Sequence, residues 1–288
     1  MDSQLKIKMK EWIFQLTSQD IHSITSQGVT IAYRDTVYRV FNESIKYSLK
    51  SKELPATLYE LIHNDFFISQ SMALRRILDA GYYKKKREVC SIFSIARDMI
   101  KHISLFNRQD YLQCLQEDEL KQYANSESLG YRKQQLRDYR EKNFKVISNG
   151  KEIASTELLH NIIDRLKRKK EKLDNYVNNY IAHSSMLDNR VFFDESYKIT
   201  IGYLQSIYKE IIWANSIFGR FILGKPVLFE VPSINYNKFL GWDTSIVDSK
   251  YLRQLDAYWF YRVKLFHKWF YNYWNTNEYI NSPYKKKK

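Results

Sequence analysis

The chain has 288 residues and a formal net charge of +14, from 46 Lys and Arg against 32 Asp and Glu. The length suffices for one large or two small domains, and the charge favours an anionic partner such as nucleic acid. Cys90 and Cys114 are the only cysteines, which excludes a disulfide framework and favours a reduced, cytoplasmic setting. No apolar run reaches the ~18 residues of a membrane span.

Glycine and proline are scarce, at 8 and 4 residues, which favours long helices over a fold with many turns. Apolar residues recur at helical spacing through the first half of the chain. Gly28 is expected to break the pattern, and helices are expected to restart after Pro55 and stop at Gly81. The predicted helices of this half cover residues 2–24, 33–49, 56–80, 82–106 and 109–123.

The clearest helix lies in the second half, at 155–183, where Ser155 or Thr156 is suited to cap it. A further helix runs from a cap at Asp194 to about Leu223, and Gly224 followed by Pro226 ends it. A last helix covers about 250–275.

These elements predict an all-α bundle over residues 1–224. A polar insertion or mobile loop is expected within it at 124–153, with a short helix near 131–142. Residues 225–288 are expected to form a C-terminal appendage: an irregular linker, then an aromatic and basic helix, then a lysine tail. That helix suits base stacking, a dimer contact or packing on the bundle, and packing is the interpretation we favour.

A polar group is predicted at the end of the 155–183 helix, in the stretch "DNYVNNYIAHSS". Residues four apart share a helix face, so Asn175, Asn179 and His183 form one row, with Asn178 near the same turn. A histidine beside amides suits proton transfer next to a bound phosphate. From spacing alone, a histidine that caps the helix or fills the core edge is the more common outcome.

The stretch "KLDNYVNNYIAHSS" (172–185) resembles the active-site helix of the HEPN superfamily of nucleotide-binding helical bundles. The stretch "QSMALRRILDAGYYKKKREVCSIFSIARDMIKH" (70–102) is similar to an earlier helix pair in the abortive-infection branch of that superfamily. The resemblance implies a HEPN-like bundle that binds RNA as a homodimer, in phage defence or a toxin system. It also implies a metal-independent endoribonuclease in which His183 is catalytic, with no cofactor.

The sequence departs from the superfamily motif, which places an arginine four to six residues before the histidine. Tyr176, Val177 and Asn178 occupy those positions, and asparagine has neither the charge nor the reach of a guanidinium. Either Arg75 or Arg76 of the earlier helix replaces the missing charge in space, or the site binds without cutting. A catalytically inactive module that binds nucleic acid or protein is therefore the alternative.

A run of cations precedes this site on the same helix, in "DRLKRKKEKLD" (164–174). Contacts with RNA phosphates and a solvated helix face explain the run equally well. No Gly-rich phosphate loop, zinc motif or carboxylate cluster is present in the sequence, so neither a metal nor a cofactor is expected. The cations are Arg165, Lys167, Arg168, Lys169, Lys170 and Lys172.

Overall fold

The computed structural model describes residues 4–18, 20–47, 55–79, 90–114, 129–182, 199–225, 227, 229 and 249–275. These residues form helices and no strand, apart from one isolated bridge between Asn107 and Ile153, which confirms the predicted all-α class. The helices are α1 (Gln4–Thr17), α2 (Ile24–Ile45), α3 (Ala56–Ile77), α4 (Ile92–Lys101), η1 (Ile103–Leu105), α5 (Arg108–Cys114), α7 (Leu129–Ser148), α8 (Glu157–Tyr176), η2 (Val177–Ala182), α9 (Ile201–Leu223), η4 (Ser249–Tyr251) and α11 (Leu252–Asn275).

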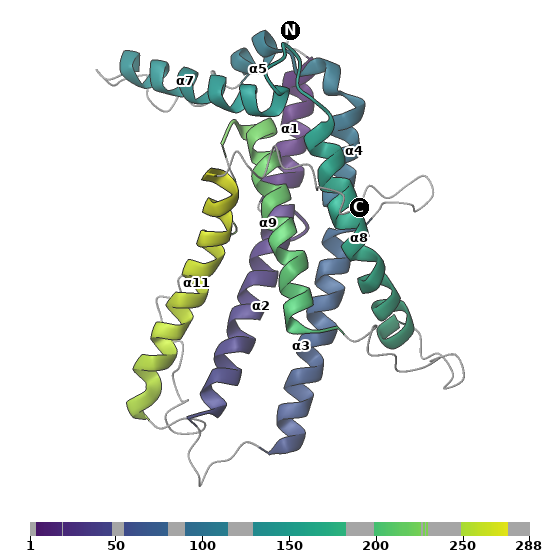
Figure 1. The fold of residues 1–288 in the computed structure, drawn as a ribbon, viewed down its shortest axis with the longest axis vertical. Coiled ribbons are helices and arrows are strands. Elements are labelled where there is room, and N and C mark those ends of the chain that lie inside the picture. The colour runs from purple at the N-terminus through teal and green to yellow at the C-terminus, as the bar shows by residue number, and fades with distance from the viewer. Residues whose placement is uncertain are drawn as a thin grey trace, which may run out of the picture.

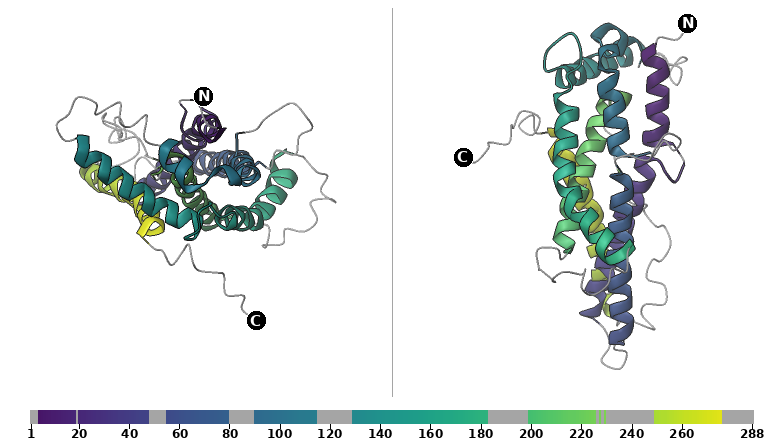
Figure 2. Two further views of the ribbon diagram at one scale, coloured as in Figure 1. Left: turned by 90° about the horizontal axis from the view of Figure 1, so that it is seen from above. Right: turned by 90° about the vertical axis from the view of Figure 1, so that its right-hand side faces the viewer.

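The long helices run along one axis and form an elongated bundle, and α7 lies across one end of it (Figures 1 and 2). Helix α9 is its centre, because it contacts α1, α2, α3, α4, α7, α8 and α11. Its side chains are buried almost all round, as expected of a helix with neighbours on every side. Thr200 caps its first turn, and Gly224 ends it with φ 64°, which confirms the predicted stop.

Gly28 does not break a helix, contrary to the prediction. Helix α1 ends at Thr17, and α2 begins after the cap residue Ser23 and continues through Gly28. A Cβ at Gly28 would lie 2.5 Å from the Phe229 ring. Glycine is therefore needed here for close packing, which a single sequence does not distinguish from a turn.

The polar region at 124–153 contains a packed helix. Helix α7 is 20 residues long, well beyond the short helix predicted near 131–142, and it packs against α9 and α5. Phe144 and Ile147 are buried in the core, and the Asn143 side chain donates to the Gly224 carbonyl at the end of α9. The prediction of an insertion or mobile loop does not describe residues 129–148.

Helix α11 packs along α2 and α9, beside the rest of the bundle (Figure 1). Leu255, Trp259, Phe266 and Phe270 are buried in the same hydrophobic core as the earlier helices. We expected residues 225–288 to form an appendage to a bundle that ends at residue 224. In the structure, α11 instead shares one hydrophobic core with the earlier helices. None of the described helices is both long and apolar enough to cross a membrane.

Candidate nucleic-acid interface

Helix α8 carries the predicted site and forms where the sequence predicts it. Thr156 is its cap residue, and the Glu157 amide donates to the Ser155 hydroxyl at 3.2 Å. Its buried residues follow helical spacing and pack against α9 and α4. They are Leu158, Leu159, Ile162, Leu166 and Leu173.

The end of this helix differs from the prediction, because η2 is a π-helix. Hydrogen bonds in a π-helix span five residues, so α-helical geometry holds only as far as Tyr176. The predicted row of Asn175, Asn179 and His183 assumed four-residue geometry throughout. Asn179 is exposed and Asn178 half-buried, while His183 lies outside the described residues.

Arg75 reaches this helix end from α3, which contacts both α8 and η2. Its Nε lies 3.5 Å from Oδ1 of Asp174, and Lys170 pairs with Oδ2 of the same carboxylate. One carboxylate shared by two cations leaves a net formal charge of about +1. The Arg75 side chain is 31% exposed, so solvent reaches this group, which we call the Asp174 cluster.

Arg76 has a different environment. Its Nε donates to the Gln27 amide oxygen at 3.2 Å, on the side of α3 that faces α2. Of the two arginines considered for the missing motif charge, only Arg75 has a described contact with α8. The carboxylate that Arg75 meets on α8 is Asp174.

The cations predicted as a phosphate-binding run divide into inward and outward groups. Arg165 forms a buried ion pair with Glu210 of α9 at 2.8 Å, and its guanidinium lies 4.4 Å from the Trp213 ring centroid. Lys169 bonds Ser206 at 3.0 Å, and burial lowers its pKa, while Glu210 opposes that shift.

These two residues join α8 to α9, so part of the predicted basic run lies on the side of α8 that faces the bundle. The ammonium of Lys172 lies 5.3 Å from the centroid of the Tyr203 ring. Lys167 and Arg168 are exposed. The outward basic surface of α8 thus consists of Lys167 and Arg168, next to the Asp174 cluster.

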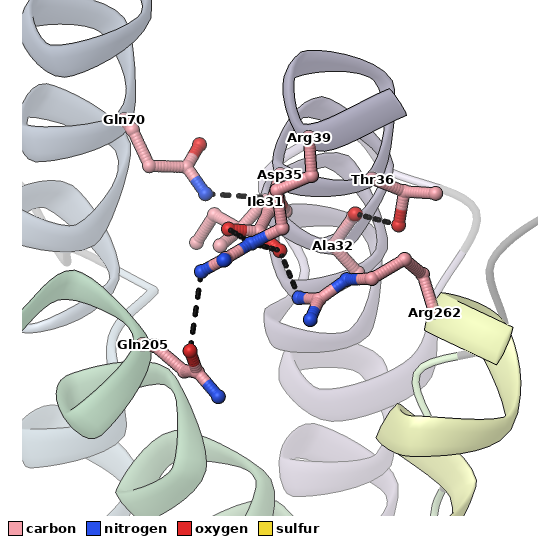
Figure 3. Close-up of polar contacts among 8 residues, drawn as sticks. All are labelled: Ile31, Ala32, Asp35, Thr36, Arg39, Gln70, Gln205 and Arg262. Atoms are coloured by element: carbon pink, nitrogen blue, oxygen red, sulfur yellow. Dashed lines mark hydrogen bonds and ion pairs between the residues drawn. The ribbon is translucent and has the colours of Figure 1, made fainter. Parts of the chain in front are cut away.

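A second polar group lies inside the bundle and was not predicted (Figure 3). The Arg39 Nε lies 3.0 Å from both Asp35 carboxylate oxygens, and Arg262 of α11 lies 2.6 Å from one of them. Arg39 also donates to the Gln205 amide oxygen of α9 at 3.1 Å, and Gln70 of α3 donates to the Ile31 carbonyl at 2.9 Å. This Asp35 cluster links α2 with α9 and α11.

One residue of the Asp35 cluster, Arg262, stands out in the sequence. Arg262 falls within the buried stripe Leu255, Trp259, Phe266 and Trp269, where an apolar residue is expected at helical spacing. A charge at such a position is buried only with a partner, and no local residue identifies that partner.

Among the residues that the structure describes, no three His, Cys, Asp or Glu side chains form a group suited to a metal. The Asp174 cluster offers a guanidinium, an ammonium and neighbouring amides, which are donors for phosphate oxygens. Comparisons with models of known protein families, with curated proteins and with solved structures found no match to this chain.

Proposed function

We propose that this protein is a HEPN-like helical bundle that binds RNA along the outer face of α8 and η2. One observation carries the proposal: Arg75 of α3 approaches Asp174, at the end of α8 where the superfamily motif arginine is missing. Lys167 and Arg168 extend the basic surface along the helix. The net charge of +14 adds long-range attraction for a polyanion.

The π-helical end gives further support, because such turns occur frequently at functional sites. It directly precedes His183, which the resemblance marks as the catalytic residue. In the catalytic form of the proposal, His183 takes the proton from a 2′-hydroxyl whose oxygen attacks the adjacent phosphorus. The bond from phosphorus to the 5′-oxygen breaks, the 5′-oxygen takes up a proton from water, and the products end in a 2′,3′-cyclic phosphate and a 5′-hydroxyl. Arg75 and Asn179 would orient the phosphate, and no metal would take part.

The binding step is tested with a fluorescein-labelled single-stranded RNA, by anisotropy at several salt concentrations. Arg75→Ala should weaken binding about threefold to tenfold and reduce the salt slope by about one, as expected for one lost phosphate contact. Arg76→Ala is the matched control, since it removes the same charge one residue away. Equal effects of the two substitutions would contradict the proposed site.

The cleavage step is tested with the same RNA in the presence of a chelator. Wild type should release cyclic-phosphate products, His183→Ala should release none, and His160→Ala, on the same helix, should behave as wild type. Equal cleavage by wild type and His183→Ala would remove His183 from the reaction. RNA binding without products from wild type would leave the inactive module as the function.

The resemblance also implies a homodimer, in which the motifs of two subunits face one cleft. It further implies a role in phage defence or a toxin system. Light scattering of the purified protein checks the dimer directly. A monomeric mass at micromolar concentration would remove it from the proposal and leave the RNA-binding face unchanged.

A further inference from the structure

Helix α3 carries a second apolar stripe on its outer face. Its members are spaced three, four, three and four residues apart, which is the a/d pattern of a helix that packs against another helix. Asp65 occupies the middle position and is also exposed. The apolar members are exposed by 42% at Leu58, 64% at Leu61, 43% at Ile68 and 43% at Met72.

The opposite face of α3 already supplies the core contacts of this helix. Phe66, Leu74 and Ile77 are buried against the bundle. A helix at the surface of a bundle ordinarily has one apolar stripe and a polar outer face. A second stripe in solvent therefore indicates a contact with another helix.

A groove of about 660 Å³ lies beside the stripe, between α2 and α3. Tyr33, Val37 and Phe41 of α2 form one wall, and Leu61 and Ile62 of α3 contribute to the other. A groove between two helices is a recurring site for the apolar face of a third helix.

The floor of this groove is firmly packed. Tyr38 and Phe66 stack with ring centroids 3.8 Å apart and planes 7° from parallel, and the Tyr38 hydroxyl meets the His63 Nδ1 at 2.5 Å. An incoming side chain would therefore meet a preformed surface, which lowers the cost of ordering on binding.

The charge of this surface differs from that of the protein as a whole. The chain has a net charge of +14, yet no Lys or Arg occurs from Ala56 to Leu74, where Glu60 and Asp65 are the acids. Asp65 has no hydrogen bond or ion pair with the residues that the structure describes. The α3 side of this surface is thus apolar with one carboxylate at its centre, and Arg34 of α2 also lines the groove.

We propose that the α3 stripe and its groove bind an amphipathic helix of a partner protein. That helix has apolar residues at three- and four-residue spacing and a Lys or Arg opposite Asp65. A second copy of α3 is the wrong occupant, because a two-fold axis would place Asp65 against Asp65, and a charged central position disfavours self-pairing.

The probes are two synthetic amphipathic helical peptides with leucines at this spacing, identical except for a central Lys or Glu. In calorimetry with the full chain, the Lys peptide should bind about tenfold more tightly than the Glu peptide, as a close charge pair at an interface allows. Long-range attraction acts in the opposite direction, since the protein is positive, so this preference reports the local carboxylate.

The variant Asp65→Lys should reverse the preference and bind the Glu peptide more tightly. Leu61→Glu should abolish binding of both peptides. Glu60→Lys, which makes the same change outside the stripe, is the matched control and should keep the Lys preference. Thermal melting checks that each variant is folded, and these exposed positions should leave the midpoint nearly unchanged.

Three results would overturn the proposal. The first is the absence of binding by either peptide at millimolar concentration. The second is a preference that Asp65→Lys leaves unchanged. The third is concentration-dependent dimerisation that Leu61→Glu removes, because the stripe would then be covered by a second copy.

Discussion

The Asp35 cluster and the Asp174 cluster have the same balance of charges but different surroundings. Each has one aspartate shared by two cations, Arg39 and Arg262 in the first and Arg75 and Lys170 in the second. The exposed fraction of the aspartate side chain is 11% in the first and 27% in the second. The side chain of Arg262 is 5% exposed, against 31% for Arg75.

This difference shows that burial, and not residue type, decides what a surplus positive charge does. In the Asp35 cluster Arg262 is enclosed by the bundle and Arg39 is 17% exposed, and the two cations join α2 to α11 and α9. In the Asp174 cluster solvent reaches the guanidinium, so a phosphate oxygen is able to replace the carboxylate as its partner.

The largest expected effect comes from removal of the shared carboxylate. Asp35→Ala should lower the free energy of unfolding by about 3–5 kcal/mol, because it leaves buried guanidinium groups without a counter-charge. Asp174→Ala should change it by about 0–1 kcal/mol, as for an exposed pair. Urea denaturation of the two variants measures both values, and similar losses would contradict the contrast.

A smaller effect is expected from removal of one cation of the buried cluster. In Arg262→Met, Asp35 retains Arg39, and methionine fits the apolar stripe of α11, so the loss should be about 1–2 kcal/mol, below that of Asp35→Ala. Arg253→Met, at an exposed position of the same helix, is the control. A larger loss for Arg262→Met than for Asp35→Ala would show that Arg39 does not neutralise the carboxylate.

The smallest expected effect is on RNA binding. It is a gain in affinity, whereas the two preceding predictions are losses of stability. Asp174→Asn should leave stability unchanged and tighten RNA binding about twofold to threefold, because it frees Arg75 and Lys170 for phosphate. The measurement is the same anisotropy titration, with Asp164→Asn on α8 as the matched control. Weaker binding of Asp174→Asn would show that the carboxylate positions the cations and does not compete for them.

The helices could be predicted from the sequence because they depend on local periodicity. The apolar stripes located α3, α8 and α11, and Gly224 marked the end of α9. The prediction failed where a distant residue decides the outcome. At Gly28 the glycine leaves room for the Phe229 ring and does not mark a turn, and the polar helix α7 packs against α9.

The candidate site was predictable only in part, for the same reason. Helical spacing predicted α8, but the π-helical end that carries Asn178 and Asn179 was not predicted, and the choice of Arg75 over Arg76 depends on how α3 lies beside α8. The inward direction of Arg165 depends on Glu210 in another helix. Ion pairs between helices carry no local periodicity, so a single sequence does not reveal them.

The Asp35–Arg262 contact has a consequence for synthesis of the chain on the ribosome. The two residues are 227 positions apart, so α2 leaves the exit tunnel long before its second arginine is made. Until then Asp35 meets only Arg39, and the sides of α2 and α9 that α11 will cover remain bare. A nascent chain that stalls before α11 would therefore expose an apolar surface that chaperones bind, and the bundle closes only when its last described helix arrives.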